Sequence, residues 1–111
     1  MGRALSAPSA EDKFAALSSS LRRKPDVSTG RMFGSEGLKI ANRVFAMLVK
    51  GRLVVKLPEA RVEDLIQAGA GDRFDPGHGR LMKEWVAVGP EAGIDWQALA
   101  NEALRYVKSG R

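Results

Sequence analysis

The clearest pattern of apolar and polar positions in the chain is the run from residue 43 to residue 57, RVFAMLVKGRLVVKL. Large and β-branched apolar residues lie on both sides of Lys50 and Gly51, a pair suited to a tight turn. This pattern predicts a β-hairpin that turns at these two residues. Pairing the two arms sorts the side chains onto two unlike faces. We expect helices to cover the first face, which is purely apolar and consists of Val44, Ala46, Leu48, Leu53, Val55 and Leu57.

The second face of this hairpin has an apolar centre and a basic rim, and it is the predicted binding surface. An apolar patch of this kind is unfavourable in water. We therefore expect a ligand, a second chain or a folded-back terminus to cover Phe45 and Met47. The residues of this candidate sheet face are Arg43, Phe45, Met47, Arg52, Val54 and Lys56.

Apolar residues at helical spacing predict three helices. The first begins after Ser9, a residue suited to capping a helix, and ends before Pro25. The second covers residues 58–68, and glycines end it. The third begins near Asp95 and has the most regular amphipathic stripe of the chain.

Further strands are predicted on both sides of the second helix. Residues 27–33 have the composition of a strand, which glycines at residues 34–37 interrupt by a bulge or a tight reversal and which residues 38–40 continue. Residues 81–88 alternate between apolar and polar side chains, which is typical of a half-buried strand.

The order of these elements predicts an α+β fold. We expect a two-layer sandwich with an antiparallel or mixed sheet, helices on one face, and the order α-β-β-β-α-β-β-α. Residues 1–8 are predicted to be a flexible N-terminal tail and residues 9–111 a single domain, in keeping with the length of 111 residues.

Composition narrows the classes of function. The chain has no cysteine, which excludes disulfides, thiolate metal sites and cysteine nucleophiles. The first eight residues lack the apolar stretch of a signal peptide, and no segment approaches the ~20 apolar residues of a membrane span. We therefore expect a cytoplasmic protein with no membrane partner, no metal and no cofactor.

Basic residues are unevenly distributed along the chain. The formal net charge is +5, and residues 31–56 contain six cations and a single anion, Glu36. A basic sheet face is suited to nucleic acid, and Lys39 and Lys50 would then extend the candidate sheet face. The structural alternative is that cations on exposed strands discourage aggregation between sheet edges.

The segment around the single histidine, His78, is the remaining place where chemistry is conceivable. Asp75 and Glu84 are near it in sequence and would be its partners in acid–base catalysis. The proline and glycines of residues 75–80 are explained by a tight surface turn, and no spacing here matches a metal-binding loop. We therefore predict no catalytic residue and no enzyme.

Two cations follow this turn and form a second candidate site. Arg80 and Lys83 would hold an anionic group, assisted by backbone amides of the glycine-rich turn. The structural alternative is that Arg80 pairs with Asp75 or Glu84 and holds the loop in place.

Several stretches of the sequence together resemble the N-terminal domain of the TfoX/Sxy family, over about residues 11–108. They are RMFGSEGLK at 31–39, VFAMLVKG at 44–51, KLP at 56–58 with RV at 61–62, and FDPGHGR at 74–80 followed by MKEW at 82–85. The combination is specific, although each stretch alone is a weak signal.

The resemblance implies a two-layer fold of the order given above. The family includes regulators of natural competence, and its longer members carry a second, helical C-terminal domain suited to nucleic acid. The sequence stops at Arg111 without such a domain, so we expect a stand-alone form of the N-terminal domain. Family membership of this kind says more about fold than about function.

Two hypotheses of function follow. The first is a small, non-enzymatic regulatory or adaptor protein whose candidate sheet face binds a protein, either another chain or a second copy in a homodimer. The apolar centre would then supply affinity, and the charges would steer the encounter. The alternative is direct binding of nucleic acid through the basic sheet face, as in a transcription or competence regulator.

Overall fold

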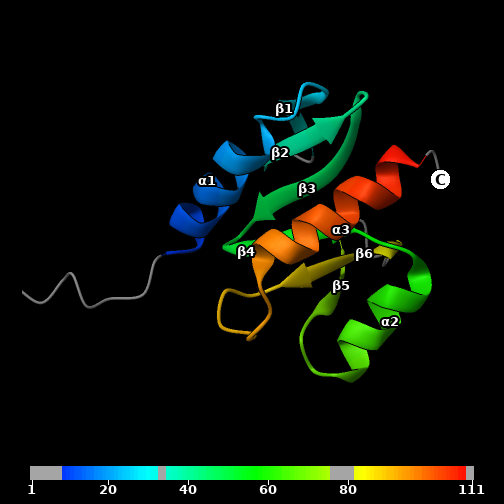
Figure 1. The fold of residues 1–111 in the computed structure, drawn as a ribbon. Helices are drawn as coiled ribbons and strands as arrows, with labels where there is room; N and C mark the ends of the chain where they lie inside the picture. Colours follow the sequence, from blue (N-terminus) through cyan, green and yellow to red (C-terminus); the bar gives the residue numbers. More distant parts are fainter. Residues whose placement is uncertain (1–8, 33–34, 76–81, 110–111) are drawn as a thin grey trace, which may run out of the picture.

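The computed structural model describes residues 9–32, 35–75 and 82–109. The described residues form three helices and a six-stranded sheet, which confirms the predicted α+β class (Figure 1). The predicted N-terminal tail lies outside the described residues. The elements are α1 (Ala10–Leu21), β1 (Val27–Met32), β2 (Ser35–Ile40), β3 (Arg43–Val49), β4 (Arg52–Lys56), α2 (Glu59–Gln67), β5 (Asp72–Phe74), β6 (Met82–Val88) and α3 (Trp96–Lys108).

The sheet is antiparallel throughout, with the strand order β1-β2-β3-β4-β6-β5. It has one strand more before α2 than predicted, because the chain reverses between β1 and β2. Met32 pairs with Ser35, and the register continues without a shift to Val27 opposite Ile40. The interruption in the strand is therefore not a bulge: residues 35–37 already belong to β2, and residues 33–34, between the two strands, lie outside the described residues. β1 and β5 are the two edges of the sheet.

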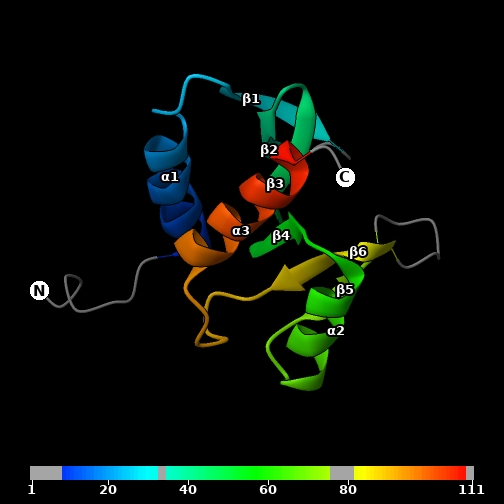
Figure 2. The ribbon, with the colours of Figure 1, turned by 45° about the vertical axis from the view of Figure 1, so that its right-hand side comes forward.

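All three helices pack on one side of the sheet, which we call the helix face; the opposite side is the far face. The main core lies between the layers and joins helix residues such as Phe14, Leu65 and Leu104 to Leu53 and Val86 of the sheet. Figures 1 and 2 show α3 across the middle of the sheet, with α1 and α2 on either side of it. The predicted layering is thus confirmed.

Local capping fixes where the helices begin. The hydroxyl oxygen of Ser9 accepts a hydrogen bond from the N–H of Asp12 at 3.1 Å, and the carboxylate of Asp95 accepts one from the N–H of Gln97 at 3.0 Å. Both contacts satisfy an amide that the helix itself leaves without a partner. None of the described helices has the length and apolar character needed to cross a bilayer.

An ion pair joins α2 to α3. Arg61 donates to both carboxylate oxygens of Glu102, at 3.0 and 3.1 Å. The hydrogen bond to Glu102 raises the pKa of Arg61 above its ordinary value. A raised pKa in the folded state means that this stabilisation is fully present below the unfolded pKa of arginine and is lost only above it. Titration of Arg61 therefore gives no pH dependence of stability near neutrality.

Replacing Arg61 with alanine is expected to lower the free energy of unfolding by at most about 1 kcal/mol. The reason is that the two side chains are 40% and 32% exposed, so water screens the pair. Urea unfolding of Arg61→Ala measures the loss, with Arg105→Ala as the control, because Arg105 is an exposed cation of α3. A loss well above that of a screened pair would contradict this interpretation.

Candidate functional site

The predicted hairpin is present, with the predicted turn. Val49 pairs with Arg52, so Lys50 and Gly51 form a two-residue turn between β3 and β4. Both have positive φ, 51° for Lys50 and 78° for Gly51. These values are those of a type I′ turn, whose twist matches that of the two strands. The register read from the sequence is confirmed from residue 46 to residue 55.

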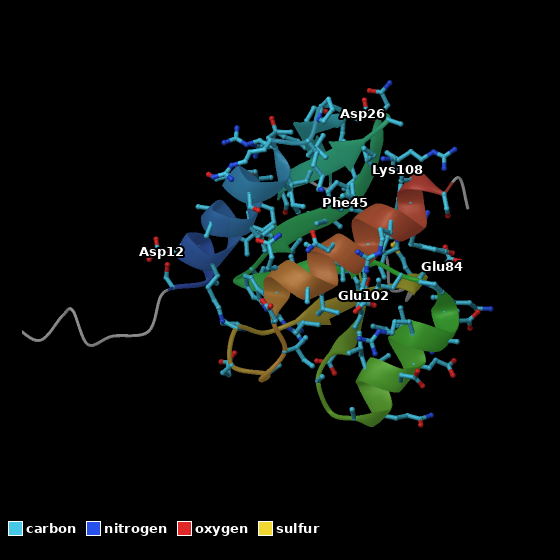
Figure 3. The ribbon with its side chains drawn as sticks, viewed as in Figure 1. Asp12, Asp26, Phe45, Glu84, Glu102 and Lys108 are labelled. Atoms are coloured by element: carbon cyan, nitrogen blue, oxygen red, sulfur yellow. The ribbon has the colours of Figure 1, made fainter. Side chains whose placement is uncertain are left out.

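A β-bulge in β3 changes the face on which its first residues lie. Leu38 pairs with Ala46, whereas its neighbour Lys39 pairs with Val44, which leaves Phe45 as an extra residue. Phe45 therefore joins Ala46 in the core beneath the helices and has 0% exposed surface (Figure 3). The prediction that Phe45 lies on the candidate sheet face is wrong, because strict alternation does not continue through a bulge.

The same bulge also reverses the faces of the sheet on which the two preceding residues lie. Arg43 pairs with Ile40, a residue of the main core, so Arg43 lies on the side of the helix face, exposed at the end of β3. Val44 lies instead on the far face, against Met47 and its neighbours. The predicted face is therefore also wrong for Arg43 and Val44.

The apolar centre of the far face is a second small core. Met47 and Val54 pair directly and have 0% exposed surface. They pack with Phe74, Trp85 and Ala87 from β5 and β6. Because the chain itself buries Met47 and Val54, the expectation that a ligand or second chain must cover an open apolar centre is wrong.

Acids of β5 and β6 pair with the two remaining cations of the candidate sheet face, which are both on β4. Arg52 Nη2 lies 2.7 Å from Asp72 Oδ2. Lys56 Nζ lies 4.0 Å from Glu84 Oε1, and the other oxygen of Glu84 accepts a hydrogen bond from the Tyr106 hydroxyl at 2.9 Å. These contacts tie β4 to β5 and β6, which is a structural role.

The two cations proposed to extend that face do not lie together. Lys39 is near the turn between β2 and β3, and Lys50 is in the turn at the other end of β3, about 20 Å away for a strand of this length. Lys39 lies flat over Gly30 of β1: a Cβ built on Gly30 would be 2.7 Å from Lys39 Cδ and 3.2 Å from Nζ. The six residues of the candidate sheet face, together with Lys39 and Lys50, therefore do not form one surface.

The second candidate site lies partly outside the described residues. Arg80 and His78 are both outside them, and the anion site stays a prediction. Lys83 is exposed on β6, and its carbonyl oxygen accepts a hydrogen bond from Arg73 at 3.4 Å. Within residues 9–32, 35–75 and 82–109, no three His, Cys, Asp or Glu side chains are placed to hold a metal ion.

Opposite charges gather at the two ends of the sheet. Residues 22–43, which include β1 and β2, contain six cations and two anions. The last turn of α3 lies at the same end of the molecule and adds two cations (Figures 1 and 2). We call residues 22–43 and this turn the basic half. Its cations are Arg22, Arg23, Lys24, Arg31, Lys39, Arg43, Arg105 and Lys108.

The other end of the sheet is acidic. Residues 59–75, which include α2 and β5, contain five acids and two cations, and Glu91 and Asp95 follow β6. We call these residues the acidic half. Both of its cations are paired, Arg61 with Glu102 and Arg73 with Glu63. Figure 3 shows Asp26 and Lys108 at the basic end and Glu102 nearer to α2.

The basic half is not predicted from the sequence, although the sequence contains all of its charged residues. The window of residues 31–56 includes Arg52 and Lys56, which the structure pairs with acids. It omits the basic triplet at residues 22–24 and the end of α3, which the fold brings to the same end. Only the topology joins these segments.

A cleft of about 480 Å³ lies in the acidic half, where β4 begins and two loops meet. Its charged side chains are Arg52, Asp72 and Glu91. Arg52 already pairs with Asp72, and the lining contains no nucleophile beside a base. The cleft therefore offers no arrangement for covalent or acid–base catalysis.

The fold and its charged ends define a small two-layer α+β domain with one antiparallel sheet. The chain belongs to the TfoX N-terminal domain family, whose family model matches residues 19–107. This match confirms the resemblance seen in the sequence. The family is one of regulatory, non-catalytic domains. A search of curated proteins found no match.

Proposed function

We propose that this chain is a regulatory adaptor domain that binds an acidic protein partner through the basic half. The observation that carries this proposal is the separation of charge across the sheet. Family membership supports the regulatory role, and the charge separation supports the location and the chemistry of the partner.

The cations of the basic half are placed to act on a partner. Arg52, Lys56, Arg61 and Arg73 each pair with an acid, and none of these four belongs to the basic half. Clustered charge of one sign raises the rate at which an oppositely charged partner associates. The exposed cations of the basic half include Arg22, Arg23, Lys24, Arg43, Arg105 and Lys108.

The acidic half favours one orientation of the partner during association. An acidic partner is attracted to one end of the domain and repelled from the other, which disfavours wrong orientations. A uniformly basic domain of the same net charge would lack this second effect. The charge arrangement thus favours one binding geometry.

Nucleic acid is the second candidate partner, because arginine-rich surfaces suit phosphate groups. The described residues 22–32 and 35–43 contain no aromatic side chain on which bases could stack. A duplex bound through its phosphates is therefore the form of nucleic acid that fits this surface.

Reversing two charges of the basic half is expected to weaken binding of a labelled oligoglutamate peptide at least about tenfold, measured by fluorescence anisotropy. The test variant is Arg43→Glu with Arg105→Glu. The matched control is Lys50→Glu with Lys83→Glu, which changes the net charge equally at exposed sites outside the basic half. Circular dichroism checks that both variants fold.

The control is expected to bind the peptide nearly as well as the wild type. Equal losses in both variants would contradict the proposal, because binding would then depend only on net charge. A labelled DNA duplex, measured at two salt concentrations, serves as the second probe. Tighter binding to DNA than to oligoglutamate, lost in the test variant alone, would favour the nucleic-acid function.

A further inference from the structure

Among the strands that the structure describes, β1 is unpaired along one side, and this edge of the sheet lies within the basic half. It is the first strand in the sheet order, and of the described elements it packs closely against β2 and β3. Figures 1 and 2 show no helix or strand beyond it. Such an edge presents backbone donors and acceptors that can pair with another strand.

The register shows which backbone groups of β1 face outward. Ile40 and Arg43 close a two-residue turn whose residues, Ala41 and Asn42, have φ of 51° and 68°. In such a hairpin the closing pair exchanges hydrogen bonds, so the N–H and C=O of Ile40 face β3. Its partner in β1, Val27, therefore faces the open edge.

A turn contact supports this orientation independently. The N–H of Val27 donates to the carbonyl of Lys24 at 3.2 Å, away from β2. Because backbone direction alternates along a strand, Ser28 and Gly30 bond to β2, and Thr29 faces outward. No described residue bonds to the outward N–H of Thr29.

Lys39 brings a positive charge toward the same edge. Its side chain crosses from β2 over Gly30 of β1, with Nζ 3.2 Å from the place a Cβ would occupy. A larger residue at Gly30 would displace this side chain. The glycine therefore allows the ammonium group to lie one strand nearer the free edge.

The opposite edge of the sheet lacks these properties. β5 has three residues, its pairing with β6 contains a register shift, and it belongs to the acidic half. β1 has six residues and an uninterrupted register. Short and irregular edges are poor templates for strand addition.

We propose that an extended acidic segment of a partner protein adds to the sheet as a strand beside β1. Its backbone bonds to Thr29, and an acidic side chain on the far face meets the ammonium of Lys39. This mode of recognition rests on the proposed function and specifies how the basic half holds its partner. A second copy of this chain is a poorer occupant, because its β1 lies in an equally basic surface.

Thr29→Pro tests the backbone contact. Proline removes the outward N–H but leaves the bonds from Ser28 and Gly30 to β2, so the variant is expected to fold. Its affinity for a peptide of alternating glutamate and threonine should fall about two- to tenfold, the effect of one hydrogen bond. Ser28→Pro is the matched control, and it should lower the melting temperature because it removes a bond within the sheet.

Two measurements on the folded wild type keep the test independent of the proline variant. An N-methylated peptide of the same charge should bind more weakly, and the unmodified peptide should slow hydrogen exchange at the Thr29 amide. Lys39→Gln should weaken peptide binding and reduce its dependence on salt.

Equal binding of the methylated and unmodified peptides, with Thr29→Pro unaffected, would overturn strand addition and leave the proposed function standing. If the wild type bound neither oligoglutamate nor the alternating peptide, the proposed function itself would be overturned. A dimer that forms through β1, and that Thr29→Pro dissociates, would also overturn the proposal, because a second copy would then occupy the edge.

Discussion

Replacing Phe45 with alanine is expected to lower the free energy of unfolding by about 3–5 kcal/mol. Phe45 is fully buried beneath the helices, and the β-bulge places it there together with Ala46. Truncation removes the apolar surface of the ring and leaves a cavity that the packed strands and helices fill only in part. Chemical denaturation followed by circular dichroism measures the loss.

Phe45→Leu is the control for this prediction. Leucine retains most of the apolar volume, so the expected loss is about 1–2 kcal/mol. A small loss in both variants would contradict the bulge, because it would mean that Phe45 lies on an exposed surface. The side chains of β3 would then alternate between the two faces of the sheet without interruption, as in a strand without a bulge.

Replacing Val54 with aspartate is expected to prevent stable folding, with a loss of at least about 3–5 kcal/mol. Val54 lies at the centre of the far-face core, among Met47, Trp85 and Ala87, and has 0% exposed surface. A carboxylate there loses its hydration among apolar side chains. The cations two residues away on the same face of β4, Arg52 and Lys56, already pair with Asp72 and Glu84. Thermal unfolding is the measurement.

Val49→Asp is the matched control on the same face. Val49 is only partly buried at the margin of this core, so its carboxylate keeps contact with water and a smaller loss is expected. If Val54→Asp were folded as stably as Val49→Asp, the far face would be an open surface. A ligand or second chain would then be needed to cover Met47 and Val54.

The sequence predicts the hairpin well because its register depends on local chemistry. Lys50 and Gly51 adopt the positive φ values of the turn, and the register of β3 and β4 follows from them as far as the bulge. The α+β class and the layering follow from the order of elements, which is also a local property of the chain.

The bulge could not be predicted from alternation alone. It depends on the contact between β2 and β3, where a Cβ at Gly37 would lie 3.1 Å from the carbonyl oxygen of Ala46. Glycine at this position lets the backbones approach, and the extra residue, Phe45, turns toward the helices. The glycine was visible in the sequence, but its partner strand was not.

The charged surface could not be predicted because its members meet only through topology. Arg52 reaches Asp72 because β4 and β5 both flank β6, and this pairing removes Arg52 from the available cations. The basic half in turn requires that α3 end beside the turn between β2 and β3. Both facts depend on contacts between residues distant in sequence.

The most direct test of the account is to record amide NMR spectra of the wild-type chain during titration with oligoglutamate. If the basic half binds the peptide, the shifts concentrate in residues 22–31, at Lys39 and Arg43, and in the last turn of α3, while α2 and β5 stay unchanged. Shifts spread evenly over the exposed cations, or concentrated around Lys50 and Lys83, would contradict the claim that the basic half is the binding surface.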